Sequence, residues 1–158
     1  MDRARKIILV VFFMIVGLRA EQVEIVADSF FADENKQVTE FIGNVYIKKG
    51  SYDELRAAKV VVNFDKNRQP IKYTATTNAN FKVFMREKHY TGKGDVLTYE
   101  PNKEIYTITG NGHLKEIDTD KNVYGEKITI DQKNGTYNVG SGSKQPVKFI
   151  FHTEEKKK

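Results

Sequence analysis

The sequence predicts an all-β fold built from repeated antiparallel strand units, and two observations support this prediction. The first is a strand-like alternation of apolar and polar residues from Val23 onward, for example in 60–64, 71–76, 81–86 and 147–151. Turn-forming stretches interrupt the alternation at short intervals, among them DENK (33–36), KKGS (48–51), TTNAN (76–80) and EPNK (100–103). This spacing predicts about a dozen short strands. Residues 51–60 alone could be read as a short helix.

The second observation is an internal repeat. Residues 27–48 align without a gap on residues 94–115, which lie 67 positions further along, and with one inserted residue 55–64 align on 123–132. The aligned positions pair apolar with apolar residues: Phe30/Leu97, Phe41/Ile108, Ile47/Leu114, Val60/Ile128 and Val62/Ile130. Because a slip of one residue would send all of these to the opposite face of a sheet, the two copies are expected to turn the same face inward.

Each copy carries a Gly-Asn pair in the middle of a strand-like stretch, Gly43-Asn44 in FIGNVYIK and Gly110-Asn111 in ITGNGHLK. Such a pair fits a tight hairpin turn, or a strand that bends at the glycine or leaves space beneath it. The alternation continues in phase across both pairs, which favours the bent strand. We therefore expect a curved, wide-mouthed sheet. A turn or strand-end role accounts for Asp28 and Asp95, which recur at the start of the two copies.

The N-terminus has the pattern of a secretory signal: a short basic head, an apolar run over 7–18 and Ala20 at the cleavage position. That run would rise only about 18 Å as a helix, which is short of the ~30 Å hydrocarbon core. We predict a cleaved signal peptide over 1–20, a domain over 21–152 and a charged tail over 153–158, with an uncleaved short anchor as the alternative. Without residues 1–20, Lys+Arg falls from 26 to 22 and Asp+Glu from 21 to 20, so the net charge of +5 drops to about +2.

The remaining composition argues against several classes of function. Lys and Glu alternate along most strands instead of forming one basic face, which argues against nucleic-acid binding. The chain has no cysteine, so thiol chemistry and disulfides are excluded. His89, His113 and His152 are scattered without metal-ligand spacing, and no hydrolase, zinc-protease or phosphate-loop motif occurs. We therefore predict no enzyme activity, no cofactor and no metal site.

The first copy resembles a known pattern. Its ordered residues are Ala27-Asp28, Phe41, Gly43-Asn44-Val45, Gly50, Leu55, Ala57, Lys59 and Val60 to Val62. This string is similar to the OstA repeat of the LptA family of periplasmic lipopolysaccharide-transport proteins, and the resemblance covers about 23–151. The chain departs from the pattern at Ala57-Ala58, where Ala-Asp is usual, and at Gly112, which aligns with Val45.

The resemblance implies a partly open, twisted β-jellyroll with a V-shaped section, whose inner face holds acyl chains. It also implies a periplasmic bridge that carries lipopolysaccharide from the inner to the outer membrane. Such domains join edge to edge, head to tail with like domains and with an inner-membrane LptC-like and an outer-membrane LptD-like partner. Two alternatives stay open: a membrane-anchored LptC-like member of the same pathway, and a purely structural β scaffold without a lipid ligand.

Three sets of residues follow as candidates. The inward phase would line the groove for the lipid A portion: Phe30, Phe41, Val45, Ile47, Val60, Val62, Phe64, Ile71, Tyr73, Phe81, Val83, Leu97, Tyr99, Ile108, Leu114, Ile128, Ile130 and Phe149. The same residues could instead pack as an ordinary core. Lysines at the ends of the Gly-Asn strands are candidate phosphate contacts, or merely solvated: Lys48, Lys49 and Lys115. Candidate interface strands are Val23, Glu24, Ile25 and Val26, and Val147, Lys148, Phe149, Ile150 and Phe151. The last strand is apolar on both faces, which is typical of a covered strand.

Overall fold

The computed structural model describes residues 22–140 and 146–154. Strands are the regular elements of these residues: β1 (Val23–Val26), β2 (Ser29–Asp33), β3 (Val38–Lys49), β4 (Asp53–Phe64), β5 (Pro70–Met85), β6 (Lys88–Glu100), β7 (Ile105–Glu116), β8 (Lys121–Asp131), β9 (Thr136–Gly140) and β10 (Lys148–Ile150). The predicted signal peptide, residues 1–20, lies outside the described residues.

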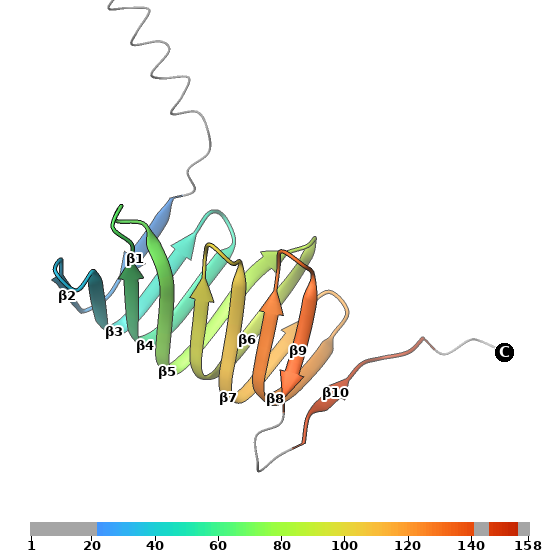
Figure 1. The fold of residues 1–158 in the computed structure, drawn as a ribbon. Coiled ribbons are helices and arrows are strands. Elements are labelled where there is room, and N and C mark those ends of the chain that lie inside the picture. The colour runs from blue at the N-terminus through green and yellow to red at the C-terminus, as the bar shows by residue number, and fades with distance from the viewer. Residues whose placement is uncertain (1–21, 141–145, 155–158) are drawn as a thin grey trace, which may run out of the picture.

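All strands belong to one antiparallel sheet in the order β1-β3-β4-β5-β6-β7-β8-β10. At each end two short strands share one long partner. β2 and β1 pair with the first and second halves of β3, and β10 and β9 pair with the first and second halves of β8. Figure 1 shows the long strands β3 to β8 side by side and curving, so that the sheet doubles over on itself. The fold is the open, twisted β-jellyroll that the sequence predicts.

The curvature coincides with a line of irregularities across the sheet. The pairing register shifts near the middle of five adjacent strands, between Ile42 and Val45, Arg56 and Lys59, Thr76 and Ala79, Lys93 and Val96, and Thr109 and Gly112. Such bulges bend a strand and increase its twist. In β3, β5 and β7 the bend contains two consecutive residues with positive φ: Gly43-Asn44, Thr77-Asn78 and Gly110-Asn111. The Gly-Asn pairs are therefore bends within continuous strands and not hairpin turns.

A carboxylate supports each Gly-Asn bend. The Asn44 side-chain amide donates a hydrogen bond to Asp28 Oδ2 at 3.0 Å, and the Asp28 backbone N–H donates to the Gly43 carbonyl at 2.9 Å. In the second copy Asn111 donates to Asp95 Oδ2 at 3.3 Å. A Cβ atom on either bend glycine would collide with the side chain of its aspartate. The positive φ and this close approach together explain why glycine stands at both positions.

The bend in β5 is a third instance of the same device, and it differs in composition. Its first residue is Thr77, with φ of 65°, where the other two bends have glycine. By register, Ala57-Ala58 of β4 lies opposite Thr77-Asn78, so Ala58 takes the place of the aspartate. This is the departure from the family pattern noted in the sequence, and it leaves the middle bend without its carboxylate.

Folding the sheet over brings its apolar faces together in one core. The most deeply buried side chains, each at most 2% exposed, are Val45, Val60, Val62, Ala75, Ala79, Met85, Leu97, Ile108, Ile128 and Ile130. Each fully buried Val, Leu or Ile contributes about 1.5–3 kcal/mol to stability. No cysteine supplements this core, so apolar packing is the main cohesive term in the folded domain.

Two sequence predictions about local structure are wrong. The described residues form ten strands rather than about a dozen, because β3 to β8 are long strands that run through their bends. TTNAN (76–80) is the bend inside β5 and not a turn between strands. The stretch 51–60, the one place where a short helix could be read, contributes to β4 in agreement with the all-β prediction, because its apolar side chains belong to the sheet core.

Candidate functional site

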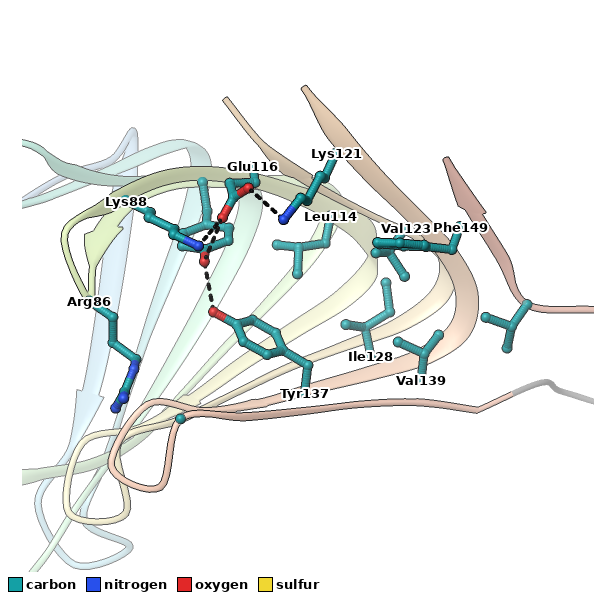
Figure 2. Close-up of a pocket in the computed structure, with 13 residues that line it drawn as sticks. Arg86, Lys88, Leu114, Glu116, Lys121, Val123, Ile128, Tyr137, Val139 and Phe149 are labelled. Atoms are coloured by element: carbon teal, nitrogen blue, oxygen red, sulfur yellow. Dashed lines mark hydrogen bonds and ion pairs between the residues drawn. The ribbon is translucent and has the colours of Figure 1, made fainter. Parts of the chain in front are cut away.

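A cavity of about 590 Å³ opens at the β8–β10 end of the sheet. We call it the C-terminal cavity. Its apolar lining consists of Leu114, Val123, Ile128, Val139, Val147 and Phe149. Its polar lining consists of Arg86, Lys88, Tyr90, Glu116, Lys121 and Tyr137. Figure 2 shows the two sets separated, with Lys88, Glu116 and Lys121 grouped above the ring of Tyr137 and the apolar side chains extending away toward β10. The cavity is therefore amphipathic.

Glu116 organises the polar side of this cavity. Its carboxylate is almost fully buried and lies 2.9 Å from Lys88 Nζ and 3.8 Å from Lys121 Nζ. The hydroxyls of Tyr90, at 3.4 Å, and of Thr119 also donate to it. Burial raises the pKa of the Glu116 carboxyl, but the hydrogen bonds from Thr119 and Lys88 and the charges of Lys88 and Lys121 outweigh burial and hold this pKa below its ordinary value. Glu116 is thus ionised at neutral pH.

Two contacts cross the C-terminal cavity. The hydroxyls of Tyr90 in β6 and Tyr137 in β9 lie 2.8 Å apart, and the Arg86 guanidinium donates to the Gln132 carbonyl at 3.2 Å. Burial and the hydrogen bond with Tyr137 raise the pKa of the Tyr90 hydroxyl, which keeps it protonated. These contacts join the β5–β6 turn and β6 to the β8–β9 hairpin and close one side of the cavity.

A second cavity, of about 390 Å³, opens at the β1 end of the sheet. We call it the N-terminal cavity. Its apolar lining comes from both layers: Val23, Ile47, Leu55, Tyr73, Phe81, Val83, Tyr99 and Tyr106. Aromatic rings dominate it, with Tyr99 stacked on Tyr106 at a centroid distance of 4.3 Å and Phe81 against Tyr106 at 5.5 Å. Lys49 Nζ lies 5.6 Å from the Tyr99 ring centroid, within reach of a cation–π contact.

The predicted lining residues fall into four groups. Those that line a cavity are Ile47, Tyr73, Phe81, Val83 and Tyr99 at the N-terminal end and Leu114, Ile128 and Phe149 at the C-terminal end. Those buried in the core that line neither cavity are Val45, Val60, Val62, Leu97, Ile108 and Ile130. Phe41 and Phe64 pack partly buried against the core. Phe30 is 69% exposed beside Phe41, and Ile71 lies in a separate shallow hollow among polar side chains.

Sequence reasoning missed several residues that line the cavities. Leu55 and Val123 were missed because counting by two from Val60 or Ile128 fails across the register shifts in the middle of the β4–β5 and β7–β8 pairs. Glu116 could have been found, because it continues the inward phase of Ile108 and Leu114. A charged residue on that apolar phase is the available signal.

The predicted phosphate contacts are dispersed. Lys49 lines the N-terminal cavity, whereas Lys48 is exposed on the opposite phase of β3. Lys115 forms an ion pair with Asp120 at 3.0 Å, on the phase of β7 opposite to Leu114. The cations that gather at the C-terminal cavity are instead Arg86, Lys88 and Lys121, and none of these was predicted.

Both predicted interface strands lie at the ends of the strand order. The structure adds β2 and β9, which form the other half of each end. The expectation that the last strand is covered is wrong for the single chain. Val147, Phe149, Ile150 and Phe151 are 40–54% exposed, because β10 pairs with β8 over only three residues. His152 Nε2 lies 3.0 Å from Asp120 Oδ2 and ties the end of this segment to the β7–β8 turn.

Within the described residues, no group of three or more His, Asp or Glu side chains could hold a metal ion. His113 lies on the outward phase of β7, where it stacks on Tyr124 at a centroid distance of 4.3 Å and contacts Asn122 Oδ1 at 2.8 Å. The part of the chain that the structure describes contains no helix long and apolar enough to span a bilayer.

Comparisons with known proteins agree with this geometry. Lipopolysaccharide export system protein LptA from Haemophilus influenzae is 29% identical over 135 residues, which cover 83% of this chain and 77% of that protein. The protein of the same name from Escherichia coli K12 is 27% identical over 120 residues, which cover 74% of this chain and 63% of that protein.

Among solved structures, the crystal structure of LptH superposes with a TM-score of 0.74 at 17% sequence identity and covers 84% of this chain and 96% of that one. LptH is described as the LptA-homologous periplasmic component of the lipopolysaccharide transport device of Pseudomonas aeruginosa. This likeness shows the fold. The family model described as LptA/(LptD N-terminal domain) LPS transport protein matches residues 24–136. The chain belongs to this LPS transport family.

Proposed function

We propose that this chain is a periplasmic carrier that holds lipopolysaccharide by its acyl chains along the inner face of the folded sheet. The observation that supports the proposal is a pair of cavities that open on one core, each with an extended apolar lining. Both are lined by side chains of the inward phase, and a buried methylene contributes about 0.8 kcal/mol to binding as it does to folding. Acyl chains that run from one cavity to the other would have to part the side chains of the core cluster that both cavities share.

The open ends of the sheet support the second part of the proposal, a bridge between the membranes. An exposed edge strand offers unpaired backbone N–H and C=O groups, which another chain can extend by strand addition. Like domains would join head to tail, β9 and β10 of one against β1 and β2 of the next. The terminal partners of such a bridge would be an LptC-like protein at the inner membrane and an LptD-like protein at the outer membrane.

Site-directed photo-crosslinking tests the lipid proposal. A benzophenone amino acid replaces Tyr73 in the N-terminal cavity or Phe149 in the C-terminal cavity of the full chain, and lipopolysaccharide is added before irradiation. Tyr46 and Tyr124 are matched controls, because they lie on the outward phase of β3 and β8, where Arg56 and Lys148 cover their rings.

Lipopolysaccharide adducts at Tyr73 and Phe149 but not at Tyr46 or Tyr124 are the expected result. Adducts at none of the four positions, in a chain whose circular dichroism shows the β fold, would overturn lipid carriage and favour a structural scaffold. Equal labelling at all four would show non-specific adsorption and would likewise contradict a binding site on the inner face.

A further inference from the structure

The two cavities occupy equivalent positions in the internal repeat. Three residues of the N-terminal cavity have a counterpart 67 positions later that lines the C-terminal cavity. Val23 corresponds to Tyr90, Ile47 to Leu114 and Lys49 to Glu116. After the inserted residue the correspondence continues with Leu55 and Val123, and with Asp53 and Lys121. The strand register agrees, because Val23 pairs with Lys49 and Tyr90 pairs with Glu116. Each copy of the internal repeat therefore contributes an equivalent cavity.

The N-terminal and C-terminal cavities carry opposite charges at equivalent positions. In the N-terminal cavity Lys49 lies opposite Asp53 in the β3–β4 register, and in the C-terminal cavity Glu116 lies opposite Lys121 in the β7–β8 register. The charged residues that line the C-terminal cavity are Arg86, Lys88, Lys121 and Glu116, which sum to a formal charge of +2. Those that line the N-terminal cavity are Lys49, Asp53, Glu54 and Asp65, which sum to −2.

The cations of the C-terminal cavity are held in place but keep donors for a ligand. Glu116 anchors the ammonium groups of Lys88 and Lys121, whose side chains remain 47% and 44% exposed. An ammonium has three N–H donors, so one carboxylate leaves donors available. Arg86 approaches from the other side of the cavity, where its guanidinium lies against Gly135 and donates to the Gln132 carbonyl. Figure 2 shows Lys88 and Lys121 beside Glu116 at the top, Arg86 apart from them at the lower left, and Ile128, Val139 and Phe149 on the right.

We propose that the C-terminal cavity is the head-group subsite of this carrier, where Arg86, Lys88 and Lys121 bind a phosphate monoester of an amphiphile. The acyl part lies on the apolar lining formed by Leu114, Ile128 and Val139. The equivalent N-terminal cavity, with its opposite charge, excludes the phosphate and takes only uncharged chain. The charge difference thus gives the bound lipid one orientation along the sheet. This proposal rests on the proposed function, because it assumes that acyl chains bind the inner face.

Competition with a bound dansyl-labelled fatty acid tests the subsite. The competitors are bisphosphorylated lipid A, the same lipid A with its phosphates removed, and inorganic phosphate alone. The variant Lys88→Gln/Lys121→Gln removes two of the cations. Lys59→Gln is the matched control, since Lys59 lines neither cavity, is 45% exposed and pairs with Glu40 at 3.7 Å. If the double variant melts at a lower temperature than the natural chain, Lys121→Gln alone replaces it, because Lys121 is the more distant partner of Glu116.

We expect phosphorylated lipid A to bind the natural chain at least about tenfold more tightly than the dephosphorylated lipid, since each charge-assisted hydrogen bond is worth about that factor. The double variant should lose most of this preference, and Lys59→Gln should keep it. Equal binding of the two lipids by the natural chain, or a preference retained in the double variant, would overturn the subsite while leaving acyl binding intact. Displacement by inorganic phosphate alone would assign the cations to a free anion instead. Failure of the natural chain to bind any acyl probe would overturn the proposed function itself.

Discussion

The side-chain amide of Asn44 donates a hydrogen bond to the carboxylate of Asp28 at 3.0 Å, across the point where β3 bends. Asn111 and Asp95 repeat this contact at 3.3 Å in β7. Each pair ties the left-handed residues of a bend to the neighbouring part of the sheet, Asp28 between β1 and β2 or Asp95 in β6, so the position of the bend is specified by side chains as well as by glycine. The cavities depend on these bends, because a flat sheet could not bring its two apolar halves face to face.

Replacing Gly110 with alanine should destabilise the fold by about 1–3 kcal/mol, because φ at this residue is 79° and the added Cβ would meet Asp95. Gly140→Ala is the matched control, since the nearest atom to its added Cβ is 4.0 Å away and its φ is not in the left-handed region. Urea unfolding followed by circular dichroism measures both. Equal effects of the two substitutions would contradict a specific requirement for glycine at the bend.

Thr77 offers the opposite test, a substitution that should stabilise the protein. A β-branched residue with φ of 65° is sterically strained, and glycine adopts that conformation without steric strain. We expect Thr77→Gly to raise the free energy of unfolding by about 1 kcal/mol. Thr76→Gly, one residue earlier and without a positive φ, should lower it by about 0.5–1 kcal/mol. A melting temperature that falls in both variants would show that the bend in β5 carries no strain.

The contrast between Thr77 and the two Gly-Asn pairs shows how far the sequence could be read. Gly43 and Gly110 indicated bends because they interrupt an apolar phase that resumes on both sides. Thr77-Asn78 carries no such signal, because a threonine does not indicate a positive φ. The composition of TTNAN predicts a turn between strands instead. Conformational strain of this kind is decided by tertiary packing, which overrides local propensity.

The candidate site was predictable where it depends on strand phase and not where it depends on bulges and turns. Ile47 and Leu114 were identified because they continue an unbroken alternation, and they line equivalent cavities. Lys88 and Lys121 lie at the first residues of β6 and β8, beside turns, where a period of two no longer determines which way a side chain points. Their approach to Glu116 joins β6 and β8 to β7, and such pairing between strands is not visible in the order of residues.

The buried carboxylate of Glu116 should make stability depend on acid pH. Its pKa in the folded protein lies below the ordinary 4.5, so its contribution is present above that value and is lost as the pH falls through the folded-state pKa. We expect Glu116→Gln to cost about 1–2 kcal/mol at pH 7 and nothing at a pH where both forms are neutral. The difference between the unfolding free energies of the two proteins across pH 2–7 isolates Glu116. The other carboxyls with lowered pKa values, Asp118, Asp120 and Asp131, are present in both proteins and cancel. A difference that stays constant with pH would contradict this account.

Association through the open ends of the sheet should depend on the exposed face of β10. Ile150, the last residue of β10, is 40% exposed and Phe151, which follows it, is 54% exposed, so an added strand or layer would cover both. The double substitution Ile150→Ser/Phe151→Ser should weaken self-association at least about tenfold, since burying such side chains contributes roughly 1.5–3 kcal/mol each. Sedimentation velocity over a range of protein concentrations measures this.

Phe84→Ser is the control, because Phe84 is similarly exposed, at 47%, but lies in β5, far from either end of the strand order. If the natural chain stays monomeric, or if Phe84→Ser weakens association as much as the β10 substitutions do, end-to-end joining of like domains is wrong and the exposed apolar surface of β10 must serve a different partner.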